Sequence, residues 1–171
     1  MLGASSEAQC RRVAAQIARA WRSQSPQRLI VGLEGPLGAG KTTWVRGMLE
    51  GLGHQGRVPS PTYTLLEYYE LNGLTLVHLD LYRLPESEAT GADGAFEALG
   101  VRDWLAHRDT WVLVEWPGRA ARLAARCDVW IEFAFVDAQQ RALRLMSRSV
   151  QGHELLQSVP SSPSVDSRFK G

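Results

Sequence analysis

One short motif constrains this chain more than any other feature. Residues 35–42 satisfy the pattern G-x-x-x-x-G-K-[ST] in full. Glycines at these spacings let successive backbone amides face a phosphate chain, and a helix that follows adds the positive end of its dipole. In such a loop the lysine reaches the β- and γ-phosphates and the hydroxyl side chain binds Mg²⁺. We therefore expect nucleotide binding by Gly38, Ala39, Gly40, Lys41, Thr42 and Thr43.

The flanking sequence favours this interpretation over a chance glycine-rich turn. The apolar run 29–33 predicts a buried parallel strand before the loop. Apolar residues at helical spacing then predict a helix that begins near Lys41 and ends at Gly51 or Gly53. Of the 19 basic residues only Lys41 and Lys170 are lysines, so a compact point charge stands where it suits a phosphate.

Two acidic residues each follow an apolar run, as the carboxylate near a P-loop metal does. Asp80 follows residues 76–79, and Glu115 follows residues 111–114. We expect one carboxylate, together with Thr42, to hold Mg²⁺ and the other to orient the attacking water. The sequence leaves open which does which, and a solvated acid at a strand end is the alternative for either.

Three further side chains are candidates at the same site. Ser60 and Thr62 lie in a proline-rich segment that cannot be helical, where a hydroxyl would approach Mg²⁺ or the γ-phosphate. The alternative is a loop with incidental hydroxyls. Trp116 directly follows Glu115 and either lines the site or packs beneath it. We expect His78 to be structural, because the four histidines show no metal-ligand spacing.

The identity of the nucleotide base is inferred from a motif that the sequence lacks. Guanine-specific GTPases carry an N-K-x-D element, and the only asparagine, Asn72, precedes a glycine. ATP is therefore the expected nucleotide.

The remaining pattern predicts an α/β protein. A helix capped by Ser5 or Ser6 ends at Ser25-Pro26, and Asn72-Gly73 predicts a hairpin between two strands. The strands expected outside the P-loop region are 64–69, 74–79, 111–114 and an antiparallel pair formed by 129–135 and 143–145. The expected fold is a P-loop NTPase-like three-layer architecture with a mixed central sheet and that antiparallel C-terminal pair.

Length and composition set the remaining limits. A chain of 171 residues argues for one domain, which we place at residues 1–150. Residues 151–171 contain five serines and two prolines without periodicity, and we expect a disordered tail. A net charge of +1 excludes a global polycation, so any nucleic-acid contact is expected to come from a local patch or through a partner. Two isolated cysteines, no signal peptide and no apolar run of about 18 residues predict a cytoplasmic protein with no membrane contact.

Four segments together resemble one family. They are Leu37 to Thr43 (LGAGKTT), Ser60 to Leu65 (SPTYTL), Asp80 to Leu84 (DLYRL) and Glu115-Trp116. In this order they resemble TsaE, also called YjeE, over about residues 7–150. A P-loop alone is common to many families, but this combination is specific.

The resemblance implies more than the spacing does. It implies a Mg²⁺-dependent ATPase, monomeric and slow alone, that docks on the TsaB–TsaD complex. That complex makes N6-threonylcarbamoyladenosine at position 37 of tRNA, and the ATPase supports repeated cycles. The resemblance places Thr62 and Asp80 around the metal and makes Glu115 and Trp116 supports of hydrolysis. The catalytic residues implied are thus Asp80, Glu115, Thr62 and Trp116.

Three departures from the family pattern stand out. Pro36 replaces a common acidic residue in the loop, and Cys10 stands where a threonine is frequent near the nucleotide. The segment 85–95 is longer than usual and belongs to a surface that could serve docking. Two other functions remain alternatives, a P-loop small-molecule kinase and a non-hydrolysing ATP-gated binding module. An arginine-rich lid, typical of such kinases, is not evident in the acidic segment 85–100.

Overall fold

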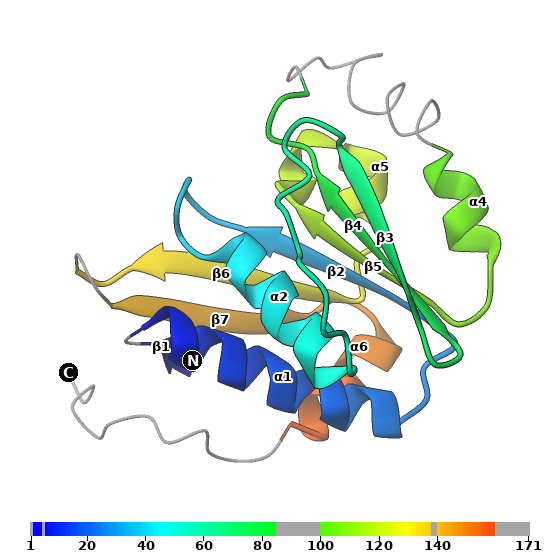
Figure 1. Cartoon of the computed structure of the whole chain (residues 1–171), viewed down its shortest axis with the longest axis horizontal. Helices are drawn as coiled ribbons and strands as arrows, with labels where there is room; N and C mark the ends of the chain where they lie inside the picture. The colour runs from blue at the N-terminus through cyan, green and yellow to red at the C-terminus, as the bar shows by residue number, and fades with distance from the viewer. Residues whose placement is uncertain (1, 5, 85–99, 138–139, 160–171) are drawn as a thin grey trace.

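The computed structural model describes residues 2–4, 6–84, 100–137 and 140–159 as a seven-stranded mixed sheet between two helical layers (Figure 1). The strand order is β1-β7-β6-β2-β5-β4-β3. Strands β6, β2, β5 and β4 are parallel, and the outer strands pair antiparallel. The strands are β1 (Leu2–Ala4), β2 (Arg28–Glu34), β3 (Leu66–Leu71), β4 (Leu74–Asp80), β5 (Thr110–Glu115), β6 (Val129–Phe135) and β7 (Arg141–Ser147).

The helices cover the two faces of the sheet unequally. One apolar core lies under α1 and α2 and includes Leu155 of α6, and a second core lies under α4 and α5. Helix α1 begins where Ser6 accepts a hydrogen bond from the amide of Gln9, as expected for an N-cap. The helices are α1 (Glu7–Ser23), α2 (Lys41–Gly51), α4 (Val101–Ala106), α5 (Ala121–Ala124) and α6 (Val150–Gln157), with a 3₁₀ turn η1 (Pro117–Arg119).

Alternation along the strands decides which side chains reach the α1–α2 face. Leu76 of β4 and Leu113 of β5 belong to the core under α1 and α2, whereas Val77 and Val114 belong to the other core. Because side chains alternate with period two, His78, Asp80 and Glu115 project to the same face as Leu76 and Leu113. The chain thus brings three polar groups to one side of the sheet.

The predicted hairpin is present with shifted bounds. Asn72-Gly73 forms the turn between β3 and β4, and Leu71 pairs with Leu74. The expected strand 64–69 instead begins at Leu66, because Leu65 adopts φ 63° and its amide donates to the carbonyl of Pro61. This left-handed residue turns the chain from the loop into β3.

The antiparallel C-terminal pair expected for the domain is formed by β6 and β7. The expected disordered tail is wrong for residues 151–157, which lie in α6. Ser149 caps this helix by accepting from the amide of Gly152, and the Trp21 indole donates to the Leu155 carbonyl at 3.0 Å. Residues 160–171 lie outside the described residues, as does the segment 85–95.

Two further expectations concern the chain as a whole. No helix among the described residues is long and apolar enough to cross a membrane. Cys10 and Cys127 are both free and buried. Burial raises the pKa of each thiol to about 12.

Candidate functional site

The turn between β2 and α2 has the backbone shape that its glycines predict. Gly38 and Gly40 take φ values of 76° and 104°, which other residues rarely adopt. A Cβ on Gly35 would overlap the backbone of Phe133, so this position also requires glycine. No hydrogen bond within the described residues uses the amides of Gly38 and Gly40. The turn therefore offers backbone donors beside the N-terminus of α2.

Lys41 is buried inside this turn. Its ammonium group donates to the carbonyl oxygens of Gly35 and Pro36 at 2.7 and 2.9 Å and lies 3.8 Å from the centre of the Trp116 ring. Burial lowers the pKa of Lys41, and the carboxylates of Glu115 and other nearby acids oppose that shift. Among the described residues no carboxylate forms an ion pair with this ammonium group. A buried cation held by neutral oxygens is a strong attractor for an anion.

Glu115 joins the first turn of α2 to strand β4. Its Oε1 accepts from the Thr42 hydroxyl at 2.7 Å and lies 2.9 Å from Nε2 of His78. The carboxylate side chain is 5% exposed and His78 is fully buried. The Thr42 hydroxyl directs its proton to Glu115, so its lone pairs remain available to a cation.

Asp80 holds the loop that carries the second pair of hydroxyls. Its Oδ2 accepts from Thr62 at 3.0 Å and from Ser60 at 3.3 Å, and its Oδ1 accepts from the amide of Tyr82 at 3.0 Å. The hydroxyl oxygens of Ser60 and Thr62 also lie 2.8 Å apart. The proline-rich segment thus presents both hydroxyls to a buried carboxylate.

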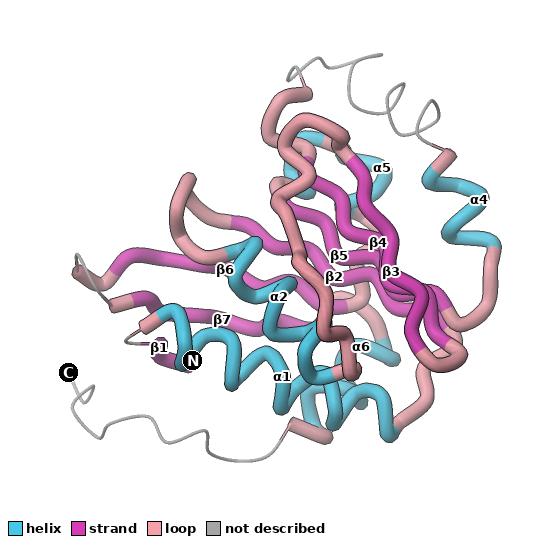
Figure 2. The backbone as a smooth tube through the Cα atoms, in the orientation of Figure 1, coloured by secondary structure: helices cyan, strands magenta, loops and turns pink. Residues whose placement is uncertain are grey.

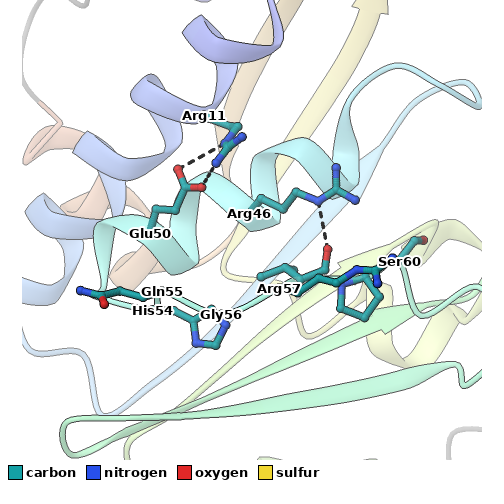
Figure 3. A pocket seen from close by; sticks show the side chains of 10 residues that line it. Arg11, Arg46, Glu50, His54, Gln55, Gly56, Arg57 and Ser60 are labelled. Carbon is teal, nitrogen blue, oxygen red and sulfur yellow. Dashed lines mark hydrogen bonds and ion pairs between the residues drawn. The ribbon is translucent and has the colours of Figure 1, made fainter.

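The same segment is anchored along α2. Figure 2 shows the connection from α2 to β3 running back beside that helix. Arg46 donates to the Val58 carbonyl at 3.0 Å, at the edge of a cavity of about 620 Å³ (Figure 3). Arg11 and Glu50 form an ion pair across the α1–α2 contact in this cavity. The anchor fixes the approach of the chain to Ser60.

Trp116 lines the site. It takes a left-handed conformation with φ 61° directly after β5, and its amide donates to the Leu33 carbonyl. Its ring faces the Lys41 ammonium group and lies 5.2 Å from the ring of Tyr82. The indole therefore covers the buried lysine.

These groups surround one cavity of about 380 Å³ at the carboxyl ends of β2, β4 and β5. That position, where parallel strands end at one sheet edge, is where open α/β sheets bind ligands. The lining residues are Leu37, Gly38, Gly40, Lys41, Thr42, Thr43, Ser60, Thr62, Asp80, Tyr82, Glu115 and Trp116.

Nearly every site residue predicted from the sequence meets at this cavity. Ala39 is the exception, since its side chain is 1% exposed in the core and its amide donates to the Pro36 carbonyl. His78 has a polar contact that the histidine spacing did not indicate. The sequence does hold one indication of this contact: His78 lies two residues before Asp80, and residues two apart on a strand share a sheet face.

Two of the departures from the expected family pattern, Cys10 and Pro36, keep their side chains out of this cavity. Cys10 is 5% exposed within the core under α1 and α2. Pro36 is exposed, and only its carbonyl takes part in the loop contacts described above. Neither side chain lines the cavity.

Comparison with known proteins connects this chain to one family. A model of the family described as threonylcarbamoyl adenosine biosynthesis protein TsaE matches residues 4–143. The tRNA threonylcarbamoyladenosine biosynthesis protein TsaE of Haemophilus influenzae is 38% identical over 128 residues, which is 75% of this chain and 76% of the relative. The protein of the same name from Synechocystis is 37% identical over 119 residues, which covers 62% of this chain and 68% of the relative.

The fold has a solved counterpart. The crystal structure of Bacillus subtilis YdiB superimposes with a TM-score of 0.71, covering 92% of this chain and 91% of that one at 21% identity. At that identity the likeness concerns the fold alone. Because the family model spans most of the chain, the chain belongs to the TsaE family of tRNA threonylcarbamoyladenosine biosynthesis proteins.

Proposed function

We propose that this protein is a Mg²⁺-dependent ATPase that serves tRNA N6-threonylcarbamoyladenosine synthesis. The observation that carries the proposal is the convergence of Lys41, Thr42, Asp80 and Glu115 on one cavity beside the glycine-rich turn. A buried ammonium group, free amides and a helix N-terminus suit a triphosphate, and two carboxylates suit a divalent metal. The missing N-K-x-D element favours ATP over GTP.

The donor set fits Mg²⁺. Within the described part of the chain, no three histidine, cysteine or acidic side chains converge as an all-protein metal cage. Mg²⁺ is commonly held by one or two protein oxygens together with substrate phosphates and water. The Thr42 hydroxyl and the Asp80 carboxylate would hold it here, and the metal would neutralise charge on the phosphate oxygens.

Each residue at the cavity then has a definite task. The amides of the turn and Lys41 bind the phosphates, and the Trp116 ring keeps water from the ammonium group. Thr62 and Ser60, bonded to Asp80, hold the proline-rich loop against the cavity. Glu115, buried and anchored at one oxygen, is placed to orient the attacking water.

We extend the proposal to the partner that the family resemblance implies, the TsaB–TsaD complex. Large apolar side chains are exposed close to the cavity, with Leu37 67% and Tyr63 82% accessible. Leu37 lines the cavity, and the ring of Tyr63 stacks under Arg83 at 4.2 Å. Docking over these residues would couple ATP turnover to the modifying enzyme, and tRNA contact would be indirect.

A reconstitution tests this proposal. The chain is assayed for phosphate release from ATP and Mg²⁺, alone and with TsaB–TsaD, and tRNA modification is followed over several turnovers. We expect slow release alone, stimulation by the partners, and modification that stops after one round without this chain. Transfer of phosphate to a small acceptor would favour a kinase, and modification that continues with Glu115→Gln would favour an ATP-gated binding module.

A further inference from the structure

A buried histidine lies behind the proposed catalytic carboxylate. His78, on β4, is fully buried, and its Nε2 lies 2.9 Å from Oε1 of Glu115 on the neighbouring strand β5. Its register partner across the parallel pair is Leu113, two residues before Glu115. The imidazole does not line the cavity, so it contacts the carboxylate from the core side.

The geometry selects one tautomer of this imidazole. Nδ1 of His78 is buried and has no hydrogen-bond partner within the described part of the chain. A proton on Nδ1 would leave a buried donor unsatisfied and would set the Nε2 lone pair against a carboxylate oxygen. A proton on Nε2 donates to Glu115 and leaves only an acceptor unsatisfied. The imidazole is therefore a donor toward Glu115.

The apolar neighbours of His78 indicate that this residue does more than occupy volume in the core. The neighbouring positions on its face, Leu76 and Leu113, are fully buried apolar residues. A leucine at position 78 would extend that layer without a buried polar atom, which is costly when unpaired. The polar contact that compensates for the histidine is the bond to Glu115.

We propose that His78 is a positioning residue for Glu115. This inference rests on the ATPase function proposed above. The carboxylate oxygen that faces Thr42 is the same one that faces His78. If Thr42 turns toward a bound cation, His78 remains as the anchor of Glu115. The donor fixes the rotamer of the carboxylate, and its loss lowers the rate of the chemical step while leaving nucleotide binding intact.

Three variants separate positioning from packing. His78→Gln places an amide donor near the position of Nε2, whereas His78→Asn has a similar polar group that is too short to reach Glu115. His78→Leu fills the volume without a donor. Folding of each is checked by thermal melting, and ATP hydrolysis is measured at saturating Mg²⁺ with and without TsaB–TsaD. We expect kcat to fall about ten- to a hundredfold in the Asn and Leu variants, with KM for ATP within about twofold of wild type.

The conservative variant decides the outcome. Recovery of most of kcat in His78→Gln supports the proposal. Equal losses in the Gln and Asn variants, full activity in His78→Leu, or a loss confined to KM would each overturn it. If the Leu variant does not fold, the comparison of Gln with Asn still decides.

A second measurement does not depend on activity. Long-range ¹H–¹⁵N correlation spectra of the histidine-labelled protein report the tautomer, and the His78 signal is assigned by its disappearance in His78→Gln. We expect a protonated Nε2 whose proton shift moves upfield in Glu115→Ala. A protonated Nδ1 overturns the inference. Absence of ATP hydrolysis in the wild type would reject the proposed function, while the spectrum would still decide the His78–Glu115 bond.

Discussion

Asp80 and Glu115 are register partners at the ends of adjacent parallel strands, yet they bond to different parts of the chain. Asp80 accepts from Thr62 in the loop after α2, and Glu115 accepts from Thr42 in the first turn of α2. Two carboxylates with separate partners at one cavity can have separate tasks. This division leads to the first prediction.

Neutralising each acid should have a different effect. Asp80→Asn is expected to raise the Mg²⁺ concentration that half-saturates nucleotide binding by about tenfold, because a metal ligand loses its charge. Glu115→Gln is expected to bind Mg²⁺ and ATP nearly as the wild type does and to lose at least about a hundredfold in kcat. Calorimetric titration and a phosphate-release assay measure the two effects. The reverse pattern would exchange the roles assigned to the two acids.

Lys41→Ala should abolish measurable ATP binding, a loss of at least about a hundredfold in affinity, since the buried cation of the loop is removed. Titration of a fluorescent ATP analogue measures this. Arg12→Ala, which removes an exposed cation on α1, is the charge-matched control and should bind normally. Normal affinity in Lys41→Ala would remove the nucleotide site from the glycine-rich turn.

Thr62→Val keeps the shape of the side chain and removes the hydroxyl that bonds to Asp80. We expect ATP hydrolysis to fall about tenfold, because the loop loses one of its contacts with the buried carboxylate. Thr64→Val removes an exposed hydroxyl whose bond is to Glu67, and it should leave hydrolysis near the wild-type rate. Equal rates in the two variants would contradict a role for the Thr62 hydroxyl.

Helix α6 should contribute measurably to stability. Leu155 is 2% exposed in the core under α1, so Leu155→Ala is expected to lower the free energy of unfolding by about 2–4 kcal/mol. Val150 begins the same helix but is 79% exposed, so Val150→Ala should change it by less than about 0.5 kcal/mol. Urea denaturation compares them. A Leu155→Ala protein as stable as the wild type would mean that α6 does not pack as described.

Alkaline pH should lower the free energy of unfolding, because ionised thiols are unfavourable in the core. The pKa values of Cys10 and Cys127 are raised from 9.0 to about 12. Between these values the unfolded chain releases protons that the folded protein retains, so stability is fully present below about pH 9 and falls as the pH rises toward 12. In this range each thiol changes the free energy of unfolding by about 1.4 kcal/mol per pH unit. Chemical denaturation at pH 8 and 10.5 should show a smaller decrease in Cys127→Ala than in the wild type.

Much of this site could be predicted from the sequence because its parts are local. The turn at residues 35–40 follows from the spacing of its glycines and Lys41, and the acids at positions 80 and 115 follow from apolar runs that end in an acid. The contact between His78 and Glu115 could not be predicted in the same way, because it depends on the register of two strands far apart in the chain. Helix α6 was missed because of its eight residues only Gly152 and Leu155 are buried, which leaves almost no periodicity.

The central position of β2 in the sheet has a consequence for how the protein unfolds. This strand, which leads into the glycine-rich turn, is paired on both sides by parallel neighbours, while β1 and β3 form the rims. Rim strands open locally at little cost, whereas the interior opens only with the whole domain. The amides of β2 are thus expected to be among the slowest to exchange with solvent. Heat inactivation of this protein is accordingly expected to follow melting of the whole domain.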